Sequence, residues 1–362
     1  MTAGLGPLAC SSAEPVHGNS AGQPGSGTAG SGAGGTGQAG TSTGGTTGGT
    51  NPLPTGGGIG GAGTGGSSSQ AGGGAGTGGT GSAGTGGGAG DGSTRSPGCD
   101  KDVAEDPSAW TTHDITVAID PKLATAYGQR RYWTRPPMNY DKTKPIPLTI
   151  WAQGCNQGNN PEDTPMTIGP AADGSVQVEL LAPQNHPGPC YYAGPDGDDA
   201  KTPELPYFDE VLSEALNNYC IDTSKVFVGG YSSGGWLTSL VSCNRASVVR
   251  GVGWAAAGLQ LNHDACSGPV AAIITRGMND AGTPLAQTEA ARDSLIMRNG
   301  CTMSTAPWRP GETMFNSSSC VEYQGCMPGY PVVWCPTPGG HTNTVMDTKL
   351  SPQGFWKFWT SL

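Results

Sequence analysis

Short apolar runs, separated by polar and turn-forming residues, recur along the chain from about residue 100 onward. Several of these runs are rich in β-branched and aromatic residues, which is typical of strands buried within a sheet. The pattern therefore predicts strands at residues 114–119, 129–135, 147–152, 176–181, 226–229, 251–256, 270–275 and 330–334.

Segments with helical periodicity lie between these runs. Residues 207–220 follow Pro206 and place five apolar side chains on one helical face, namely Val211, Leu212, Ala215, Leu216 and Tyr219. Further helices are expected at residues 236–241, 283–299 and 352–362. Pro284 at the first position and Gly300 at the end mark the bounds of the helix at 283–299. The last helix is expected to bury Phe355, Phe358 and Trp359.

Strands that alternate with helices predict an α/β fold with a mostly parallel sheet and helices on both faces. In such sheets, functional side chains gather at the C-terminal ends of the strands. Candidate chemistry is therefore expected on the loops that follow strands.

The first 98 residues have a different composition, with repeats of Gly, Ser, Thr and Ala and few aromatic residues. Such a segment cannot bury enough apolar surface to offset its chain entropy. We therefore expect a disordered tether at 1–98 and a folded domain at 99–362. Leu8-Ala9-Cys10 resembles the end of a bacterial lipoprotein signal that would begin upstream. Cys10 is then either lipidated at a cell surface or the unpaired cysteine of a secreted protein.

Charge and hydropathy exclude two classes of partner. The chain carries 28 acidic and 18 basic residues, a formal net charge of -10. Because no basic stripe is available to neutralise phosphates, nucleic acid is not an expected partner. No segment is apolar enough to span a bilayer.

The cysteines indicate an oxidising compartment. Eleven are present, and ten of them lie in the folded part at wide spacing, without Cys-x-x-Cys pairs or neighbouring His ligands. Such a set favours five disulfides over a zinc site and predicts an extracellular protein. The connectivity does not follow from the spacing; the pairings we expect are Cys155 with Cys190 and Cys301 with Cys335.

A candidate nucleophile follows the predicted strand at 226–229. Gly230, Ser232 and Gly234 form a Gly-x-Ser-x-Gly motif, and a possible helix begins directly after it. Strand, tight turn and helix in this order are the context of a nucleophile elbow, where glycines let the backbones crowd and leave the serine hydroxyl clear. The chain has 63 glycines, so the motif alone could arise by chance, and its place after a strand favours the catalytic interpretation.

A serine nucleophile requires a base and an acid on later loops. His341 follows the last predicted strand through small residues, and Asp280 follows the strand at 270–275. Asp293 lies within the next helix, where a solvated charge is the simpler interpretation. The other histidines lie in the tether, ahead of the sheet proper or in loops away from the expected position; they are His17, His113, His186 and His263. Ser232, Asp280 and His341 then follow the chain order expected of α/β-hydrolases.

The oxyanion of an acyl transfer is expected to bind two backbone N–H groups. One belongs to Ser233, directly after the nucleophile, and the other belongs to Cys155 in the turn Gln153-Gly154-Cys155. This mechanism needs no metal or cofactor, and none is expected.

Several motifs in the folded part resemble the secreted feruloyl esterase and polyhydroxybutyrate depolymerase group of carbohydrate esterase family one. In chain order they are Arg131-Tyr132, Asn139-Tyr140-Asp141, residues 147–155, Tyr219-Cys220-Ile221-Asp222, residues 230–235, residues 331–335 and Gly339-Gly340-His341-Thr342. The resemblance covers about residues 99–362 and includes the cysteines. It implies an α/β-hydrolase fold, a metal-free serine esterase mechanism and extracellular, polymer-bound substrates.

Two positions depart from the pattern of this group, which usually has histidines that brace the active-site loops where this chain has Gln153 and Arg276. The leading hypothesis is a serine esterase that releases ferulate or similar acyl groups from plant cell-wall polysaccharide. Depolymerisation of polyhydroxybutyrate and removal of acetyl groups from xylan are alternatives with the same residues. A glycan-binding surface protein without catalysis is the alternative from another class. Trp236 is expected either to line the acyl pocket or to pack in the core.

Overall fold

The computed structural model describes residues 94–156, 161, 173–184, 189–191, 202–258, 266–309, 320–341 and 353–362. The tether up to residue 93 lies outside this part of the chain. Residues considered from the sequence that lie outside it include Cys10 and His17 in the tether, and His186, His263 and Thr342.

The described chain begins in contact with the folded domain. Arg95 forms an isolated bridge with Asp222, and the N–H of Ser96 donates to the carbonyl oxygen of Ile221 at 2.9 Å. Packing therefore starts a few residues ahead of the predicted boundary at Cys99.

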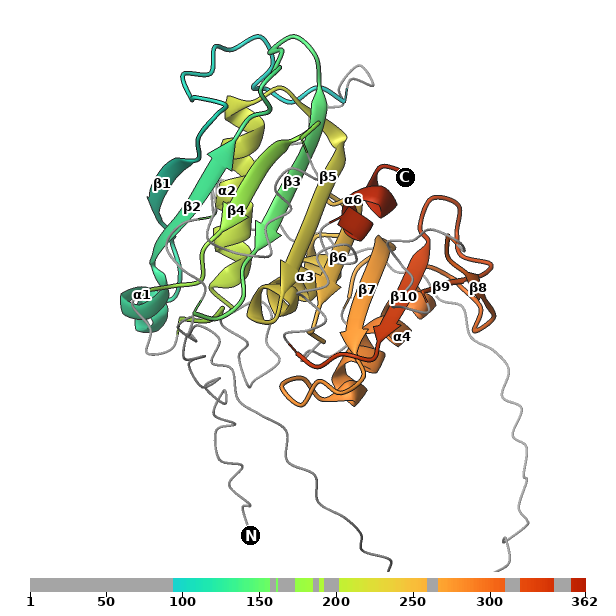
Figure 1. Cartoon of the computed structure of the whole chain (residues 1–362). Coiled ribbons are helices and arrows are strands. Elements are labelled where there is room, and N and C mark those ends of the chain that lie inside the picture. Colours follow the sequence, from blue (N-terminus) through green and yellow to red (C-terminus); the bar gives the residue numbers. More distant parts are fainter. Residues whose placement is uncertain are drawn as a thin grey trace, which may run out of the picture. The chain divides into compact units, whose positions relative to one another are not determined.

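One sheet of ten strands runs through the described residues (Figure 1). Its strands, in spatial order, are β1 (Thr111–Thr116), β2 (Gln129–Arg135), β4 (Val176–Leu180), β3 (Ile146–Ala152), β5 (Ile221–Tyr231), β6 (Gly251–Ala255), β7 (Ala271–Gly277), β10 (Val332–Thr337), β9 (Val321–Tyr323) and β8 (Thr305–Pro307). The pairs from β4 to β10 are parallel, and the pairs at both edges are antiparallel. The predicted mostly parallel sheet is confirmed.

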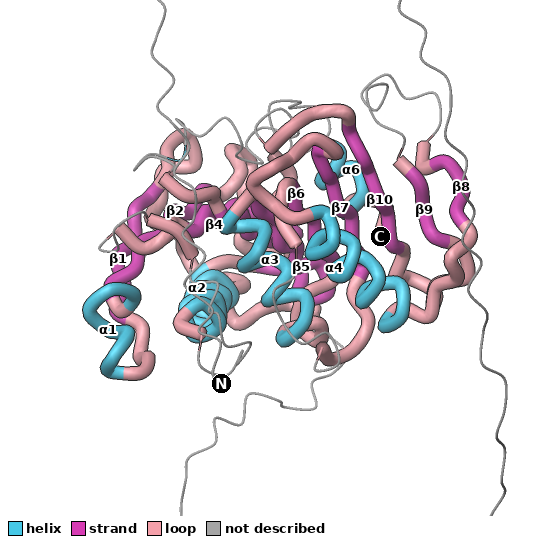
Figure 2. The backbone as a smooth tube through the Cα atoms, turned by 90° about the horizontal axis from the view of Figure 1, so that it is seen from below, coloured by secondary structure: helices cyan, strands magenta, loops and turns pink. Residues whose placement is uncertain are grey.

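Helices cover both faces of this sheet, as expected. Figure 2 shows α2 (Glu204–Asn218), α3 (Ser233–Asn244) and α4 (Leu285–Arg298) along one face and α6 (Gly354–Trp359) on the other. The short helix α1 (Pro121–Tyr127) lies beside β1 and β2. Among the described helices, none combines the length and apolar character that a membrane span requires.

Aromatic side chains fill the face that α6 covers. Phe227 of β5 stacks on Trp359 of α6, with ring centroids 5.4 Å apart. A Cβ atom on Gly253 of β6 would lie 2.8 Å from Cδ2 of Phe355, so the neighbouring strand needs a residue without a side chain there. The expected burial of Phe355, Phe358 and Trp359 is confirmed. Their packing holds the C-terminal helix on the parallel part of the sheet.

Five disulfides join all ten cysteines of the folded part, which confirms their predicted number. Cys155–Cys190 is the expected pair, but Cys301–Cys335 is wrong, because the structure pairs Cys301 with Cys326 and Cys320 with Cys335. Val321 in β9 lies opposite Trp334 in β10, so the hairpin brings their neighbours Cys320 and Cys335 together. The other two pairs are Cys99–Cys220 and Cys243–Cys266.

Several element bounds differ from those predicted, for local reasons. β1 begins three residues early, at Thr111, because half-buried and exposed residues alternate in this edge strand and leave no apolar run. α2 includes Pro206 in its first turn. Backbone N–H groups in a first turn have no acceptor within the helix, so proline costs no hydrogen bond there. Pro284 is the N-cap of α4 and not its first residue. β5 extends beyond the strand predicted at 226–229 at both ends, from Ile221 to Tyr231.

Three elements escaped the apolar pattern. β8 and β9 have three residues each, too few to show a period. α1 does carry a signal in the sequence, because Asp120 caps its first turn by accepting a hydrogen bond from the N–H of Lys122, and Pro121 follows at the first helical position.

Arg130 and Arg131 are neighbours in β2 that pair with carboxylates in opposite environments. Arg130 Nη2 lies 2.8 Å from Glu204 Oε2, and both side chains are fully buried. Its guanidinium also lies 3.8 Å from the ring centroid of Tyr207. Arg131 Nε lies 2.7 Å from Asp114 Oδ1, with 40% and 64% of the two side chains exposed.

We predict that loss of the buried carboxylate destabilises the domain far more than loss of the exposed one. Glu204→Gln leaves a buried guanidinium without its counter-charge, which should lower the free energy of unfolding by about 3–5 kcal/mol. Asp114→Asn should lower it by about 0–1 kcal/mol, because water screens that pair. Urea denaturation of both variants measures the difference, and equal losses would contradict this assignment.

Candidate active site

Ser232 stands between the C-terminal end of β5 and the first residue of α3. Its backbone has φ +51° and ψ −120°, a conformation that residues with a Cβ atom rarely adopt. A Cβ on Gly230 would lie 2.3 Å from the carbonyl oxygen of Gly234, and one on Gly234 would lie 2.0 Å from that of Ala152. The predicted strand, tight turn and helix are therefore present, and the glycines are required by close backbone contacts.

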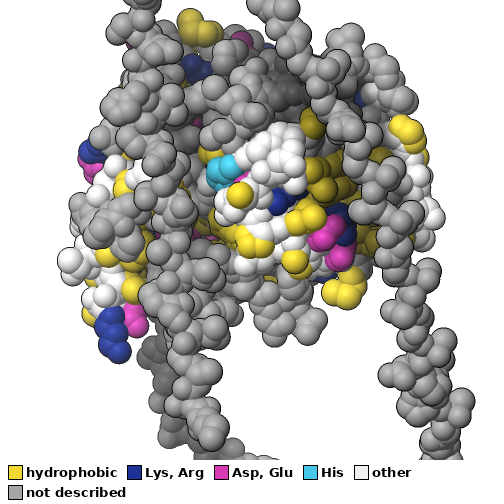
Figure 3. Space-filling model, turned by 60° about the horizontal axis from the view of Figure 1, so that its bottom comes forward, with side chains coloured by type: hydrophobic (Ala, Val, Ile, Leu, Met, Phe, Trp, Pro, Cys, Tyr) yellow, Lys and Arg dark blue, Asp and Glu magenta, His cyan; other side chains and the backbone are white. Residues whose placement is uncertain are grey.

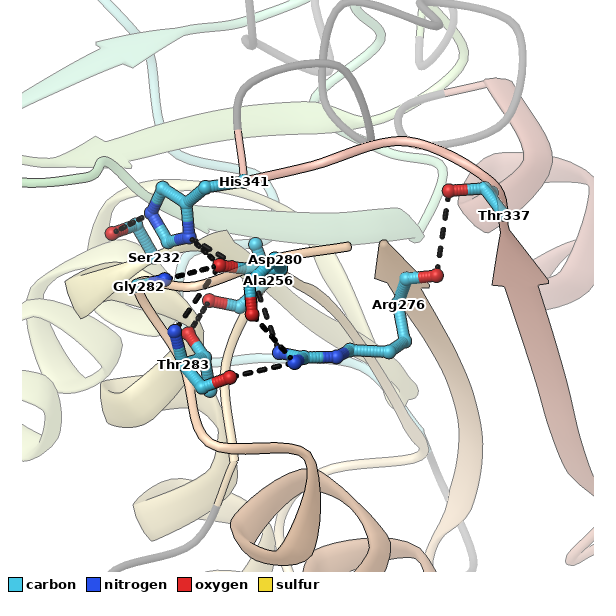
Figure 4. Close-up of polar contacts among 8 residues, drawn as sticks. All are labelled: Ser232, Ala256, Arg276, Asp280, Gly282, Thr283, Thr337 and His341. Atoms are coloured by element: carbon cyan, nitrogen blue, oxygen red, sulfur yellow. Dashed lines mark hydrogen bonds and ion pairs between the residues drawn. The ribbon is translucent and has the colours of Figure 1, made fainter. Parts of the chain in front are cut away.

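Two loops bring Asp280 and His341 to Ser232 (Figure 4). Asp280 follows β7, and His341 follows the neighbouring strand β10. His341 Nε2 lies 2.9 Å from Ser232 Oγ, and His341 Nδ1 lies 3.0 and 2.9 Å from Oδ1 and Oδ2 of Asp280. If Nδ1 carries the proton and donates it to the carboxylate, Nε2 accepts from the serine hydroxyl. The three residues predicted from the sequence thus form one hydrogen-bonded chain.

The carboxylate of Asp280 is fully buried and receives further hydrogen bonds. The N–H groups of Gly282 and Thr283 donate to Oδ1 at 2.7 and 3.1 Å, and Arg276 Nη1 donates to Oδ2 at 3.2 Å. Burial alone would raise the pKa of Asp280, but the hydrogen bond with His341 and the nearby charges outweigh it and hold that pKa below the usual value. The carboxylate therefore stays ionised beside the imidazole.

Arg276 is a site residue whose role the sequence did not reveal. Its buried guanidinium also donates from Nη2 to the carbonyl oxygens of Asp280 at 3.0 Å and Thr283 at 2.6 Å. Arg276 thus binds both ends of the segment 280–283 and places a positive charge beside the Asp280 carboxylate. In the sequence, position 276 stood out because the group that the chain resembles usually has histidine there. That difference marked the position but did not show that Arg276 contacts Asp280.

The loops that carry Asp280 and His341 are also bonded to each other. The N–H groups of Met278 and Asn279 donate to the carbonyl oxygens of Thr337 and Gly339 at 2.8 and 3.1 Å. The side-chain amide of Asn279 donates to Pro338 at 2.7 Å. These bonds continue the pairing of β7 with β10 beyond the strand ends and hold the loops of Asp280 and His341 together.

The imidazole of His341 is reachable from solvent, with 29% of its side chain exposed. Its ring packs against Tyr231, with centroids 5.3 Å apart. On the face shown in Figure 3, a histidine side chain is exposed among mostly apolar and uncharged groups of the described residues.

The turn predicted to supply an oxyanion donor lies against Ser232. A Cβ on Gly154 would lie 2.9 Å from Cδ1 of Tyr231 and 3.3 Å from the Cβ of Ser232. Cys155 follows directly and is tied to Cys190. Ser233 begins α3, where the first N–H groups have no partner within the helix. The turn that carries Cys155 and the start of α3 thus both adjoin the serine, and the positive end of the helix dipole would stabilise an anion there.

The remaining sequence candidates lie elsewhere or have another role. His113 belongs to β1 and not to a segment ahead of the sheet, and its Nε2 lies 2.7 Å from Thr134 Oγ1. Asp293 pairs with Arg292 on the surface of α4, as the simpler interpretation expected. Trp236 is half-buried and packs against the core. Within the described part of the chain, no group of three or more His, Cys, Asp or Glu side chains is arranged to hold a metal ion.

Comparison with known proteins gave several relatives, although no family model matches the chain. Feruloyl esterase D of Neurospora crassa is 30% identical over 284 residues, which cover 73% of this chain and 90% of that protein. Feruloyl esterase C of Emericella nidulans is 26% identical over 239 residues, covering 63% and 83%. Among solved structures, an acetyl xylan esterase from Aspergillus awamori has a TM-score of 0.47 at 13% identity, covering 68% of this chain and 99% of that one.

We predict that Gly234→Ala disables the site, because its Cβ would meet backbone atoms that cannot turn away. The resulting shift of α3 against β3 should slow the phosphonylation of Ser232 by a fluorophosphonate about 100-fold, as expected for a displacement of about 1 Å. Mass spectrometry follows the rate of labelling. Gly174→Ala is the matched control, since its Cβ would lie 3.9 Å from Cζ2 of Trp356. A Gly234→Ala protein labelled as fast as this control would contradict the account of the elbow.

Proposed function

Because this chain belongs to the feruloyl esterase family of carboxylic ester hydrolases, we propose that it releases ferulate or related acyl groups from plant cell-wall polysaccharide through an acyl-enzyme on Ser232. The hydrogen-bonded chain of Ser232, His341 and Asp280 carries this proposal. The choice of ferulate as the acyl group rests on the names of the relatives, because the same three side chains would serve any carboxylic ester.

In the first half-reaction, Ser232 Oγ attacks the ester carbonyl carbon and His341 Nε2 takes the hydroxyl proton. A serine hydroxyl is too weak an acid to ionise unaided near neutral pH, so the transfer must accompany the attack. Asp280 holds the proton on Nδ1 and stabilises the imidazolium as it forms. The imidazolium then gives the proton to the departing sugar oxygen, which leaves as an alcohol.

The oxyanion of the tetrahedral intermediate would be held by the N–H groups of Ser233 and Cys155. Support comes from the start of α3 at Ser233 and from the contact of the neighbouring Gly154 with the serine. Both donors belong to backbone that is fixed before substrate arrives, so little reorganisation opposes charge development. Loss of one such donor typically costs about 3 kcal/mol of barrier lowering.

In the second half-reaction, water replaces the alcohol. His341 removes a proton from water, the hydroxide oxygen attacks the acyl carbon, and Ser232 Oγ leaves with the proton from the imidazolium. The products are a carboxylic acid and the free serine. In both half-reactions the transferred proton passes through His341 Nε2 while Nδ1 keeps its own proton, and no metal or cofactor is required.

An extracellular site of action fits both the disulfides and the polymer. Five disulfides join residues from Cys99 to Cys335, and such bonds persist in oxidising compartments. The Gly/Ser/Thr-rich segment at 1–98 would let the domain reach an insoluble substrate, whether or not Cys10 is lipidated.

We predict that Ser232→Ala and His341→Ala each lower kcat by on the order of a millionfold on methyl ferulate, because the two side chains act as a unit. For the same reason, the double variant should be no worse than either single one. Steady-state kinetics with a p-nitrophenyl ester as second substrate measures this. Full activity in the Ser232→Ala protein would refute the mechanism.

The acyl group is tested by comparing initial rates on methyl ferulate, acetylated xylan and hydroxybutyrate oligomers. Faster release of ferulate supports the proposal. Turnover of the acetyl or hydroxybutyrate ester alone would keep the serine mechanism and replace the substrate.

A further inference from the structure

A carboxyl group is buried in the sheet beside the active site. Glu179 of β4 is fully buried. It lies in register between two tryptophans, Trp151 of β3 and Trp133 of β2. Val178 and Leu180, on either side of it, point to the opposite core. Burial of an acidic side chain between two tryptophans is costly unless a specific contact requires it.

The contact of Glu179 is the side-chain amide of Gln153. Gln153 Nε2 donates to Glu179 Oε2 at 3.0 Å, and Gln153 is itself fully buried. Glu179 Oε1 has no hydrogen-bond donor among the described residues. Burial raises the pKa of Glu179 to about 8, against the opposing effects of the Gln153 bond and the charge of Arg135. The group is therefore mostly a neutral acid at pH 7.

Gln153 connects this acid to the catalytic serine. It is the first residue of the turn that contains Gly154 and Cys155, and its carbonyl oxygen would lie 2.4 Å from a Cβ on Gly234. The backbone N–H of Gln153 faces the carbonyl oxygen of Leu180, the residue after Glu179, at 3.4 Å. The turn is thus held to β4 by both the main chain and the side chain of one residue.

We propose that Glu179 is a positioning residue that, as a neutral acid, forms an acid–amide pair with Gln153 and fixes the turn carrying the Cys155 oxyanion donor. The neutral carboxyl accepts from the amide N–H through one oxygen and can donate its own O–H to the amide oxygen through the other. This second bond would satisfy Oε1. The inference rests on the proposed function, since it concerns how the ester oxyanion is bound.

Ionisation of Glu179 would break the pair. The O–H donor is lost, and a negative charge remains between two tryptophans. Among the described residues, the titratable groups near Glu179 and the turn of Gln153 include Arg135 of β2, Tyr231 of β5 and Tyr191, whose hydroxyl donates to the Leu180 carbonyl at 2.6 Å. Arg135 is already engaged with Gln177 and Trp110. We expect the turn that begins at Gln153 to be displaced when this buried charge forms. The displacement would reduce kcat and largely preserve substrate binding.

The test is the pH dependence of kcat and KM between pH 6 and 9.5 on p-nitrophenyl acetate, corrected for spontaneous hydrolysis. Wild-type kcat should fall roughly fivefold from pH 8 to pH 9, as expected for a group with a pKa of about 8 whose ionised form is inactive. Glu179→Ala should lower kcat about tenfold at pH 7 with little change in KM. Glu179→Gln, which mimics the neutral acid, should restore most of that loss and show no fall above pH 8.

Glu322→Gln is the matched control, because burial also raises the pKa of Glu322, in β9 at the other side of the sheet. It should keep the wild-type fall. A Glu179→Gln enzyme that still loses kcat above pH 8, or one as slow as Glu179→Ala, would overturn the proposal.

A second measurement separates this inference from the proposed function. The side-chain amide NMR signals of Gln153 should shift with a midpoint near pH 8 in the wild type and stay constant in Glu179→Gln. If that shift is present in a protein without esterase activity, the proposed function fails and the acid–amide pair stands. If the shift is absent, the pair itself is wrong.

Discussion

The backbone conformation of Ser232 is the constraint on which the rest of the site depends. A positive φ at a residue with a Cβ atom costs free energy and persists only where the surroundings enforce it. Here the enforcement comes from the crossing of β5, α3 and β3, which approach so closely that Gly230 and Gly234 have no room for side chains. The aromatic packing of α6 on the other face keeps β5 and β6 in place. The serine is therefore positioned by the centre of the sheet and not by a surface loop.

The two turns beside Ser232 share a design, in which a buried polar side chain of the sheet holds each of them. Arg276 holds the loop of Asp280 through three hydrogen bonds, and Glu179 accepts a hydrogen bond from Gln153 in the turn that carries the proposed oxyanion donor. These are the two places where the sequence departs from the group it resembles. The departures therefore do not remove the bracing. Different side chains supply it: Arg276, which carries a permanent charge, at one turn, and Glu179, a titratable acid, at the other.

The sequence predicted the features that depend on local pattern. The apolar runs located the parallel strands, and Gly-x-Ser-x-Gly located the elbow, because both follow from sterics over a few residues. The contact of Arg276 with Asp280 and that of Glu179 with Gln153 could not be predicted, because these side chains meet only after the chain has folded. The wrong pairing of Cys301 with Cys335 has the same origin, because β9 is too short to recognise and it determines which cysteine meets Cys335.

The most direct test of the central claim, that Ser232 carries the acyl group, is the mass of the protein during turnover. Rapid acid quenching of the enzyme with a feruloyl aryl ester should trap a species heavier by one feruloyl group. Peptide mapping should place that group on Ser232, and the Ser232→Ala protein should show none. Turnover without such a species, or with the acyl group on another residue, would contradict the assignment of the elbow serine as the nucleophile.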